Sequence, residues 1–169
     1  MKKKISLIGA GQIGGTLAHL ICIKELADVV LLDVAEGIAK GKALDIAQST
    51  SVDGYDINLS GTSNYEDIKN SDVIIITAGI PRKPGMTREE LIGINAGIVK
   101  TVSSSLIQHS PNTIIIVVSN PMDTMTYLVH KSTNLPKHRI IGMGGALDSA
   151  RFKYRLAEAL DAPISDVDG

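Results

Sequence analysis

Short apolar runs alternate with longer amphipathic stretches along the chain. The runs rich in β-branched residues occupy positions 5–8, 29–32, 73–76 and 114–118, and two weaker runs occupy 57–59 and 139–141. Apolar residues three or four positions apart mark the stretches between them, at 13–24, 39–48, 87–108, 122–131 and 147–160. Because parallel strands are buried on both faces and need helical crossovers, this alternation predicts an α/β fold with a doubly wound, six-stranded parallel sheet.

The stretch 87–108 gives the clearest helix. Its apolar positions keep helical spacing at Leu91, Ile94, Ile98, Val102 and Leu106. Thr87 and Glu90 have the spacing of a capping box, in which each side chain bonds the backbone N–H of the other residue. The helix is therefore expected to begin directly after Thr87.

Composition and charge remove several classes of function. Hydrophobic residues make up 44% of the chain and charged residues 21%, as in ordinary folded proteins. The net charge is −1 and the basic residues are scattered, so no basic face for nucleic acid or an anionic membrane is expected. No apolar run is long enough to span a membrane. The single Cys22, interpreted as a small core residue, permits no internal disulfide, which favours the cytoplasm.

A glycine-rich motif stands between the first strand and the first helix. Its residues are Gly9, Ala10, Gly11, Gln12, Ile13 and Gly14, which fit the pattern GxGxxG. In this position Gly9 permits a tight turn, Gly11 lets the backbone approach a diphosphate, and Gly14 allows close packing of helix on strand. The helix N-terminus attracts negative charge. The motif therefore predicts a dinucleotide-binding site of the Rossmann type.

Asp33 ends the second strand, 19 residues after Gly14. A carboxylate at this point accepts hydrogen bonds from both ribose hydroxyls and repels a 2′-phosphate, so NAD is favoured over NADP. The alternative is a purely structural glycine turn followed by an exposed aspartate.

Two other motifs suggest competing chemistry, and both are incomplete. The segment from Gly37 to Lys42 is one residue too short for a P-loop, and Ala43 stands where a magnesium-binding Ser or Thr is required. Tyr127 and Lys131 have the YxxxK spacing of short-chain dehydrogenases, but that family uses a different glycine motif. The pair is better explained as two neighbours on one helix surface.

Charged residues follow two of the later strands. The loop 77–88 contains several Gly and Pro residues and two arginines, Arg82 and Arg88, and is interpreted as a lid over the crevice. Asp148 and Arg151 lie three residues apart on a helix that follows the sixth strand, with both side chains expected to point into one pocket. Taken alone, these residues also fit solvated surface charges and a surface salt bridge.

Taken together, the motifs resemble one family. GAGQIG, TAGIPRKPGMTR, INA, VSNPMD and LDSARF occur in the order and spacing of the lactate/malate dehydrogenase family, and resemble most its bacterial malate dehydrogenases of lactate-dehydrogenase type. The likeness runs from residue 5 to about residue 154. It implies a Rossmann domain that binds NAD over residues 1–143, with residues 144–169 as only the start of a catalytic domain. It also implies a homodimer or homotetramer.

The resemblance implies roles in the binding of substrate. Arg151 is similar to the family's carboxylate anchor, whose planar guanidinium grips a carboxylate through two hydrogen bonds. Arg88 is similar to the lid arginine that polarises the substrate carbonyl, and is expected to be catalytic as well as substrate-binding. Asn120 is similar to the residue that contacts the substrate oxygen. Arg82 stands where family members acting on malate carry arginine, which implies malate and oxaloacetate rather than lactate.

For the cofactor, the resemblance adds residues after the fourth and fifth strands. These are Thr77, Ala78, Gly79, Asn95, Val118, Ser119 and Asn120. Asp148 is implied to be catalytic, because a carboxylate there orients a histidine and stabilises its cation.

The histidine itself raises a further expectation. The family's catalytic histidine lies in a GGHGD segment, which this sequence does not contain. His19, His109, His130 and His138 are interpreted as structural or surface residues, and their spacing does not predict a metal site. The 169-residue chain alone is therefore expected to be nearly inactive. Lactate dehydrogenase, or a non-catalytic NAD-binding module, are the alternatives.

Overall fold

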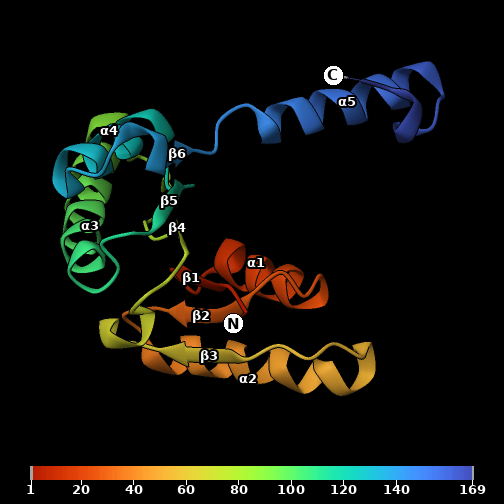
Figure 1. Ribbon diagram of the computed structural model, residues 1–169. Coiled ribbons are helices and arrows are strands. Elements are labelled where there is room, and N and C mark those ends of the chain that lie inside the picture. Colours follow the sequence, from red (N-terminus) through yellow and green to blue (C-terminus); the bar gives the residue numbers. More distant parts are fainter. Residues whose placement is uncertain (1, 169) are drawn as a thin grey trace.

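The computed structural model describes residues 2–168 and contains one six-stranded, all-parallel sheet (Figure 1). The spatial order is β3-β2-β1-β4-β5-β6. The strands are β1 (Lys4–Ile8), β2 (Asp28–Leu32), β3 (Leu59–Thr62), β4 (Val73–Ile76), β5 (Ile114–Val117) and β6 (Ile140–Gly142). The predicted doubly wound parallel sheet is confirmed.

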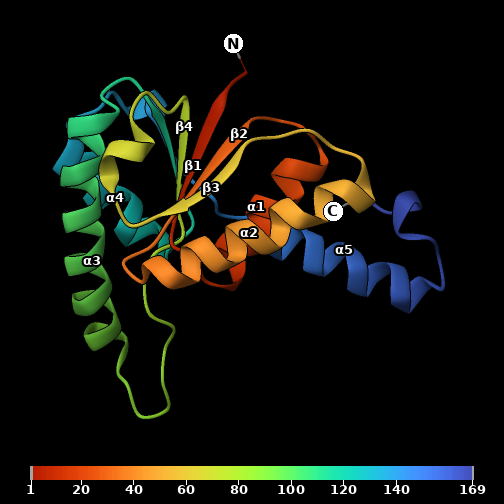
Figure 2. The ribbon, with the colours of Figure 1, turned by 90° about the horizontal axis from the view of Figure 1, so that it is seen from below.

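Helices cover both faces of this sheet (Figures 1 and 2). The α-helices are α1 (Gln12–Ile23), α2 (Glu36–Asp53), α3 (Arg88–His109), α4 (Met122–Thr133) and α5 (Ala146–Leu160). Three short 3-10 helices are η1 (Tyr65–Ile68), η2 (Lys137–Arg139) and η3 (Ile164–Asp166). Helices α1 and α2 pack on one face, and α3 and α4 pack on the other.

Alternate side chains along the strands point to opposite faces of the sheet and pack into two separate hydrophobic cores. Leu7 of β1 packs with α1 and α2, whereas the next residue, Ile8, packs with α3 and α4. Burying one such side chain contributes about 1.5–3 kcal/mol. Cys22 lies in the first core, where burial, followed by the charge of Asp28, raises the pKa of its thiol to about 11. The thiol is protonated at neutral pH and fills space, as the sequence predicted.

The start of α3 confirms the capping box. The Thr87 hydroxyl accepts a hydrogen bond from the Glu90 N–H at 3.1 Å, and the Glu90 carboxylate accepts one from the Thr87 N–H at 2.8 Å. Two helical N–H groups that lack partners within the helix are satisfied in this way.

The position of the third strand was predicted wrongly. The strand was expected at 57–59, but it runs from Leu59 to Thr62 and pairs with β2 from Val29↔Leu59 to Leu32↔Thr62. Ile57 is buried before the strand begins. The strand contains Gly61 because α2 lies directly against it, and a β-carbon there would overlap the carbonyl oxygen of Ala39. The position of β3 is therefore determined by its close packing against α2 and not by a run of apolar residues.

Helix α2 is longer than the predicted 39–48. An ion pair of 2.7 Å between Glu36 and Lys40 lies in its first turns, and Gly54 ends it in the left-handed region at φ 76°. The final turns are polar, and the hydroxyl groups of Ser49 and Thr50 donate to carbonyls three residues earlier. Because these turns lack an apolar stripe, the pattern did not reveal them.

Helix α5 extends away from the rest of the molecule (Figures 1 and 2). Four of its larger apolar side chains are exposed, namely Leu147, Phe152, Tyr154 and Leu160. Within residues 2–168, no helix is long and apolar enough to cross a membrane.

The close packing at Gly61 yields a first prediction. Gly61→Ala is expected to lower the free energy of unfolding by about 1–3 kcal/mol, because α2 must move off the sheet. Urea denaturation measures this change. Gly41→Ala is the matched control, since a β-carbon at that site in α2 meets nothing within 4 Å. The control is expected to be about 0.5–1 kcal/mol more stable than the wild type. Equal effects of both changes would contradict the packing argument.

Candidate cofactor and substrate groove

A groove lies where the carboxyl ends of β1 and β4 diverge. Beyond β1 the sheet continues with β2 and β3, and beyond β4 it continues with β5 and β6. The chain segments that follow β1 and β4 therefore run toward opposite edges of the sheet. Ligands of open α/β sheets bind at such a switch point. Two adjoining cavities of about 340 and 510 Å³ occur here, and both are lined by Gly11, Thr77, Ala78, Gly79 and Ile80.

The glycine turn forms the floor between the two cavities. Gly9 has φ +110°, where a side chain is strained, and a β-carbon there would crowd Ala78. A β-carbon at Gly14 would overlap the carbonyl oxygen of Gly9, so α1 packs directly on the end of β1. Gly11 faces open space and is the N-cap of α1. The positive end of the α1 dipole is therefore directed at the groove.

Asp33 lies beside this turn, on the wall of the smaller cavity. Its carboxylate accepts hydrogen bonds from the backbone N–H of Ala10 at 2.6 Å and of Ala35 at 2.9 Å. A carboxylate has about four acceptor positions, so two bonds fix its orientation and leave capacity for a ligand hydroxyl.

The smaller cavity also has an apolar wall that sequence reasoning missed. It is formed by Ile8, Leu32, Val34, Tyr65, Ile98 and Val102. Burial raises the pKa of the Tyr65 phenol, and the ring stacks on His109 with centroids 6.3 Å apart. The spacing of Ile98 and Val102 on α3 was visible in the sequence, but nothing there placed Tyr65 beside it.

The larger cavity gathers residues from four segments. Gln12, Ile13 and Gly14 come from α1, Arg82 from the loop after β4, Leu91 and Asn95 from α3, and Val118, Ser119 and Asn120 from the end of β5. Together with Gly11, Thr77, Ala78 and Gly79, they include most of the residues predicted from the sequence to bind cofactor or substrate. Arg82 and Asn120 therefore border the same space.

Asn95 joins two of the loops that border this cavity. Its side chain is 2% exposed, its Oδ1 accepts from the Ile80 N–H at 2.9 Å, and its Nδ2 donates to the Asn120 carbonyl at 2.8 Å. Ser119 adds a second link, because its hydroxyl donates to the Ala78 carbonyl at 2.6 Å. The loops after β4 and β5 are thus held together by buried side chains.

The geometry is matched by sequence comparison. Residues 3–142 match the description "lactate/malate dehydrogenase, NAD binding domain". The chain belongs to the lactate/malate dehydrogenase family. Curated relatives include malate dehydrogenases of Pelagibacter ubique, 60% identical over 98% of this chain, and Flavobacterium frigidimaris, 60% identical over 97%. The chain spans 52% and 53% of their respective lengths.

Solved structures give the same family. The malate dehydrogenase of Cryptosporidium parvum superposes with a TM-score of 0.94 at 46% identity, and the alignment covers 98% of this chain and 53% of that one. The lactate dehydrogenase of Cryptosporidium parvum, complexed with lactic acid and β-nicotinamide adenine dinucleotide, has a TM-score of 0.94 at 43% identity, with coverage of 99% and 53%. The groove described above therefore belongs to a family of NAD-binding domains.

Three of the charged residues singled out in the sequence lie outside this groove. Arg88 is exposed at the first residue of α3. Asp148 and Arg151 pair with each other at 3.2 Å on α5, with side chains 82% and 68% exposed. Helix α5 extends away from the sheet (Figure 1), so the predicted common pocket does not enclose this exposed pair, and neither residue borders the groove. An exposed pair of this kind contributes little to stability.

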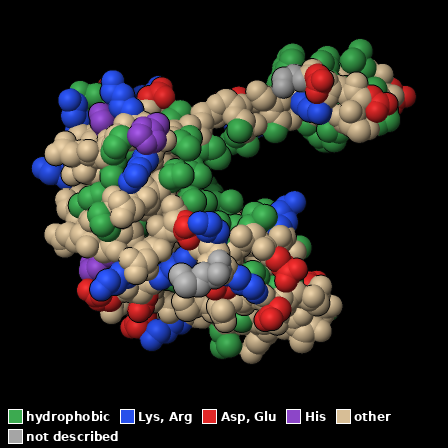
Figure 3. All heavy atoms as spheres, viewed as in Figure 1, with side chains coloured by type: hydrophobic (Ala, Val, Ile, Leu, Met, Phe, Trp, Pro, Cys, Tyr) green, Lys and Arg blue, Asp and Glu red, His purple; other side chains and the backbone are tan. Residues whose placement is uncertain are grey.

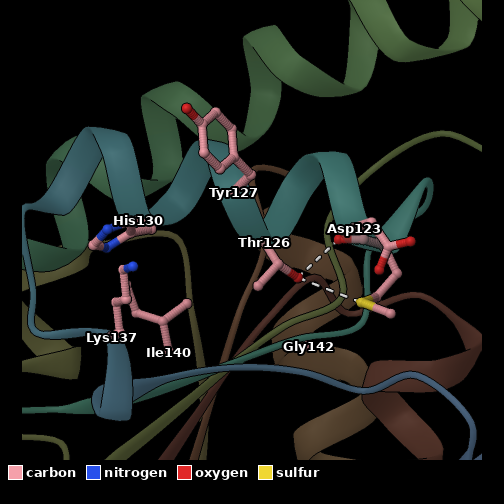
Figure 4. A pocket seen from close by; sticks show the side chains of 8 residues that line it. Asp123, Thr126, Tyr127, His130, Lys137, Ile140 and Gly142 are labelled. Carbon is pink, nitrogen blue, oxygen red and sulfur yellow. Dashed lines mark hydrogen bonds between the residues drawn. The ribbon is translucent and has the colours of Figure 1, made fainter.

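A third cavity, of about 470 Å³, lies between α4 and β6 and includes Tyr127 (Figure 4). Tyr127 points away from Lys137 and Ile140 on the other side of the cavity (Figure 4). Lys131 lies over the Tyr127 ring, 5.4 Å from its centroid. Neither residue lines the groove at the glycine turn. The YxxxK pair is therefore a surface contact in this member of the lactate/malate dehydrogenase family.

The buried amide of Asn95 yields a second prediction. Asn95→Ala leaves the Ile80 N–H and the Asn120 carbonyl without their partner, so a loss of about 1–3 kcal/mol in unfolding free energy is expected. The affinity for NADH should fall with it, since both loops border the groove. Urea denaturation and NADH fluorescence titration measure the two effects. Asn112→Ala, at an exposed turn, is the control and should stay within about 0.5 kcal/mol of the wild type. An Asn95 variant as stable as this control would refute the bridging role.

Proposed function

We propose that the protein is an NAD-dependent malate dehydrogenase, which transfers a hydride reversibly between (S)-malate and oxaloacetate. The observation that carries the proposal is the joint position of Arg82 and Asn120 on a cavity that adjoins the Asp33 cavity across the glycine turn. The names of the relatives, malate dehydrogenases at 56–60% identity, support the same activity.

The cofactor occupies the whole groove in this proposal. Asp33 accepts the adenosine ribose hydroxyls, and the backbone of Gly9, Ala10, Gly11, Gln12, Ile13 and Gly14 holds the diphosphate at the N-terminus of α1. The residues assigned to the nicotinamide half are Thr77, Ala78, Gly79, Asn95, Val118, Ser119 and Asn120. When bound, the cofactor supplies or accepts the hydride.

Arginines select and polarise the substrate. Arg82 pairs with the second carboxylate of oxaloacetate, which pyruvate lacks, and a monoacid would leave this charge unpaired in a closed site. Arg88 polarises the carbonyl as it becomes an alkoxide, and Asn120 contacts the same oxygen. Closure of the loop between β4 and α3, which extends outward in Figure 2, is the motion required to bring Arg88 to the substrate.

Residues of α5 complete the site by packing against the rest of the enzyme. Arg151 grips the first carboxylate, and Asp148 orients a histidine that exchanges the proton. Among residues 2–168, no histidine borders either part of the groove. In this proposal residues 1–143 form the NAD-binding domain, and residues 144–169 belong to the catalytic domain.

The proposal includes a homodimer or homotetramer in the cytoplasm. Apolar side chains line the hollow beside α5 in Figure 3, and exposed apolar residues occur on both α5 and α2, such as Phe152 and Leu44. Apolar surface of this extent is typical of a contact surface. The buried, protonated Cys22 is compatible with a reducing compartment.

Lactate dehydrogenase is the second candidate. It is favoured by the lactate dehydrogenase of Cryptosporidium parvum, whose TM-score of 0.94 equals that of the malate enzyme of the same organism. A non-catalytic NAD-binding module is the third candidate, but NAD binding alone does not require Arg82, Arg88 or Arg151.

The distinguishing experiment measures kcat/KM for reduction of oxaloacetate and pyruvate by the protein expressed from its complete reading frame. Oxaloacetate should be strongly preferred. Arg82→Gln should lower kcat/KM for oxaloacetate by about 100-fold, as expected for lost charged hydrogen bonds of about 3 kcal/mol in total, and should change pyruvate reduction far less.

Lys83→Gln is the matched control, because it removes a positive charge from the neighbouring exposed position of the same loop. It should leave both rates within about twofold of wild type. Equal rates with the two substrates, or equal effects of the two variants, would exclude the role of Arg82. Absence of turnover with either acid would leave only the non-catalytic module.

A further inference from the structure

A lysine from α2 reaches the glycine turn. The ammonium group of Lys42 donates a hydrogen bond to the carbonyl oxygen of Gly11 at 2.8 Å, across 31 residues of sequence. The Lys42 side chain is partly buried. Its partner, Gly11, lines both cavities of the groove. Lys42 is the last residue of the incomplete P-loop motif, and this contact places it beside the glycine turn instead.

Gly15 makes room for this side chain. A β-carbon at Gly15 would lie 3.1 Å from both the Cδ and the Nζ of Lys42, tighter than most real contacts. The GxGxxG pattern ends at Gly14 and does not require a glycine at the next position. A side chain at Gly15 would crowd the path that Lys42 takes toward Gly11.

The contact adds charge where the helix already attracts anions. The Gly11 carbonyl also accepts the N–H of Gly15 at 3.0 Å, which closes the first turn of α1. The N-terminus of a helix carries the equivalent of about half a positive charge. The ammonium group of Lys42 adds a full charge next to it and holds the N-cap peptide in place.

We propose that Lys42 is a positioning residue for the diphosphate of the dinucleotide. It acts through Gly11, by fixing the N-cap peptide of α1, and through its charge, by attracting the phosphates. The inference rests on the proposed use of the groove by NAD.

Lys40 provides a matched comparison on the same helix. Its ammonium group pairs with Glu36 at 2.7 Å, and its side chain is 62% exposed. Removal of this charge changes the net charge of the chain by the same amount but leaves the glycine turn untouched.

The experiment compares Lys42→Met, Lys42→Arg and Lys40→Met in the 169-residue chain. NADH binding is followed by fluorescence, and adenosine, which lacks phosphate, is measured as a competitor. Lys42→Met should weaken NADH binding by about tenfold, the loss expected for one charge-assisted contact, and change the adenosine constant less than twofold. The salt dependence of NADH binding should become shallower. Lys42→Arg should recover most of the affinity, and Lys40→Met should match the wild type.

Two results would overturn the role of Lys42. One is NADH binding by Lys42→Met within twofold of wild type, and the other is an equal loss of NADH and adenosine, which would indicate a collapsed turn. Thermal unfolding of each variant separates such a collapse from a loss of charge. Failure of the wild-type chain itself to bind NADH would instead reject the use of the groove by NAD, and the role of Lys42 with it.

Discussion

The close approach of α1 to the carboxyl end of β1 is the constraint on which the groove depends. Gly14 lies against the carbonyl of Gly9, and any side chain there would push the helix off the strand. This contact aims the N-terminus of α1 at the switch point of the sheet, where the strand order diverges. Without it, the positive end of the helix would not reach the groove.

Three segments from different parts of the chain contact this turn. The Asp33 carboxylate accepts a hydrogen bond from the Ala10 N–H. The Thr77 hydroxyl donates a hydrogen bond to the Gly9 carbonyl at 3.1 Å, and the Lys42 ammonium group donates one to the Gly11 carbonyl. Each bond spans more than 20 residues, so the turn is held by the ends of β2 and β4 and by α2 rather than by its own sequence. A preorganised turn of this kind avoids much of the entropic cost of ordering when an anion binds.

Much of the fold and part of the groove followed from local pattern, and what escaped prediction depends on tertiary packing. The strands rich in β-branched residues, the capping box at Thr87 and the glycine motif after β1 each have a local signal. The strand around Gly61 does not, because its place is set by the backbone of α2. Tyr65 was missed for a similar reason, since a single 3-10 turn brings it to the groove. For Asp148 and Arg151 the local prediction succeeded and the tertiary one did not. Helical spacing placed the two side chains together but gave no information on where α5 would lie.

We propose that the glycine turn and Asp33 form an NAD site that excludes a 2′-phosphate. Calorimetric titration of the 169-residue chain with NADH and with NADPH measures this preference. We expect one site per chain for NADH and binding of NADPH weaker by at least about tenfold, because the carboxylate and the extra phosphate repel each other. Equal affinities for the two cofactors, or no binding of either, would contradict it.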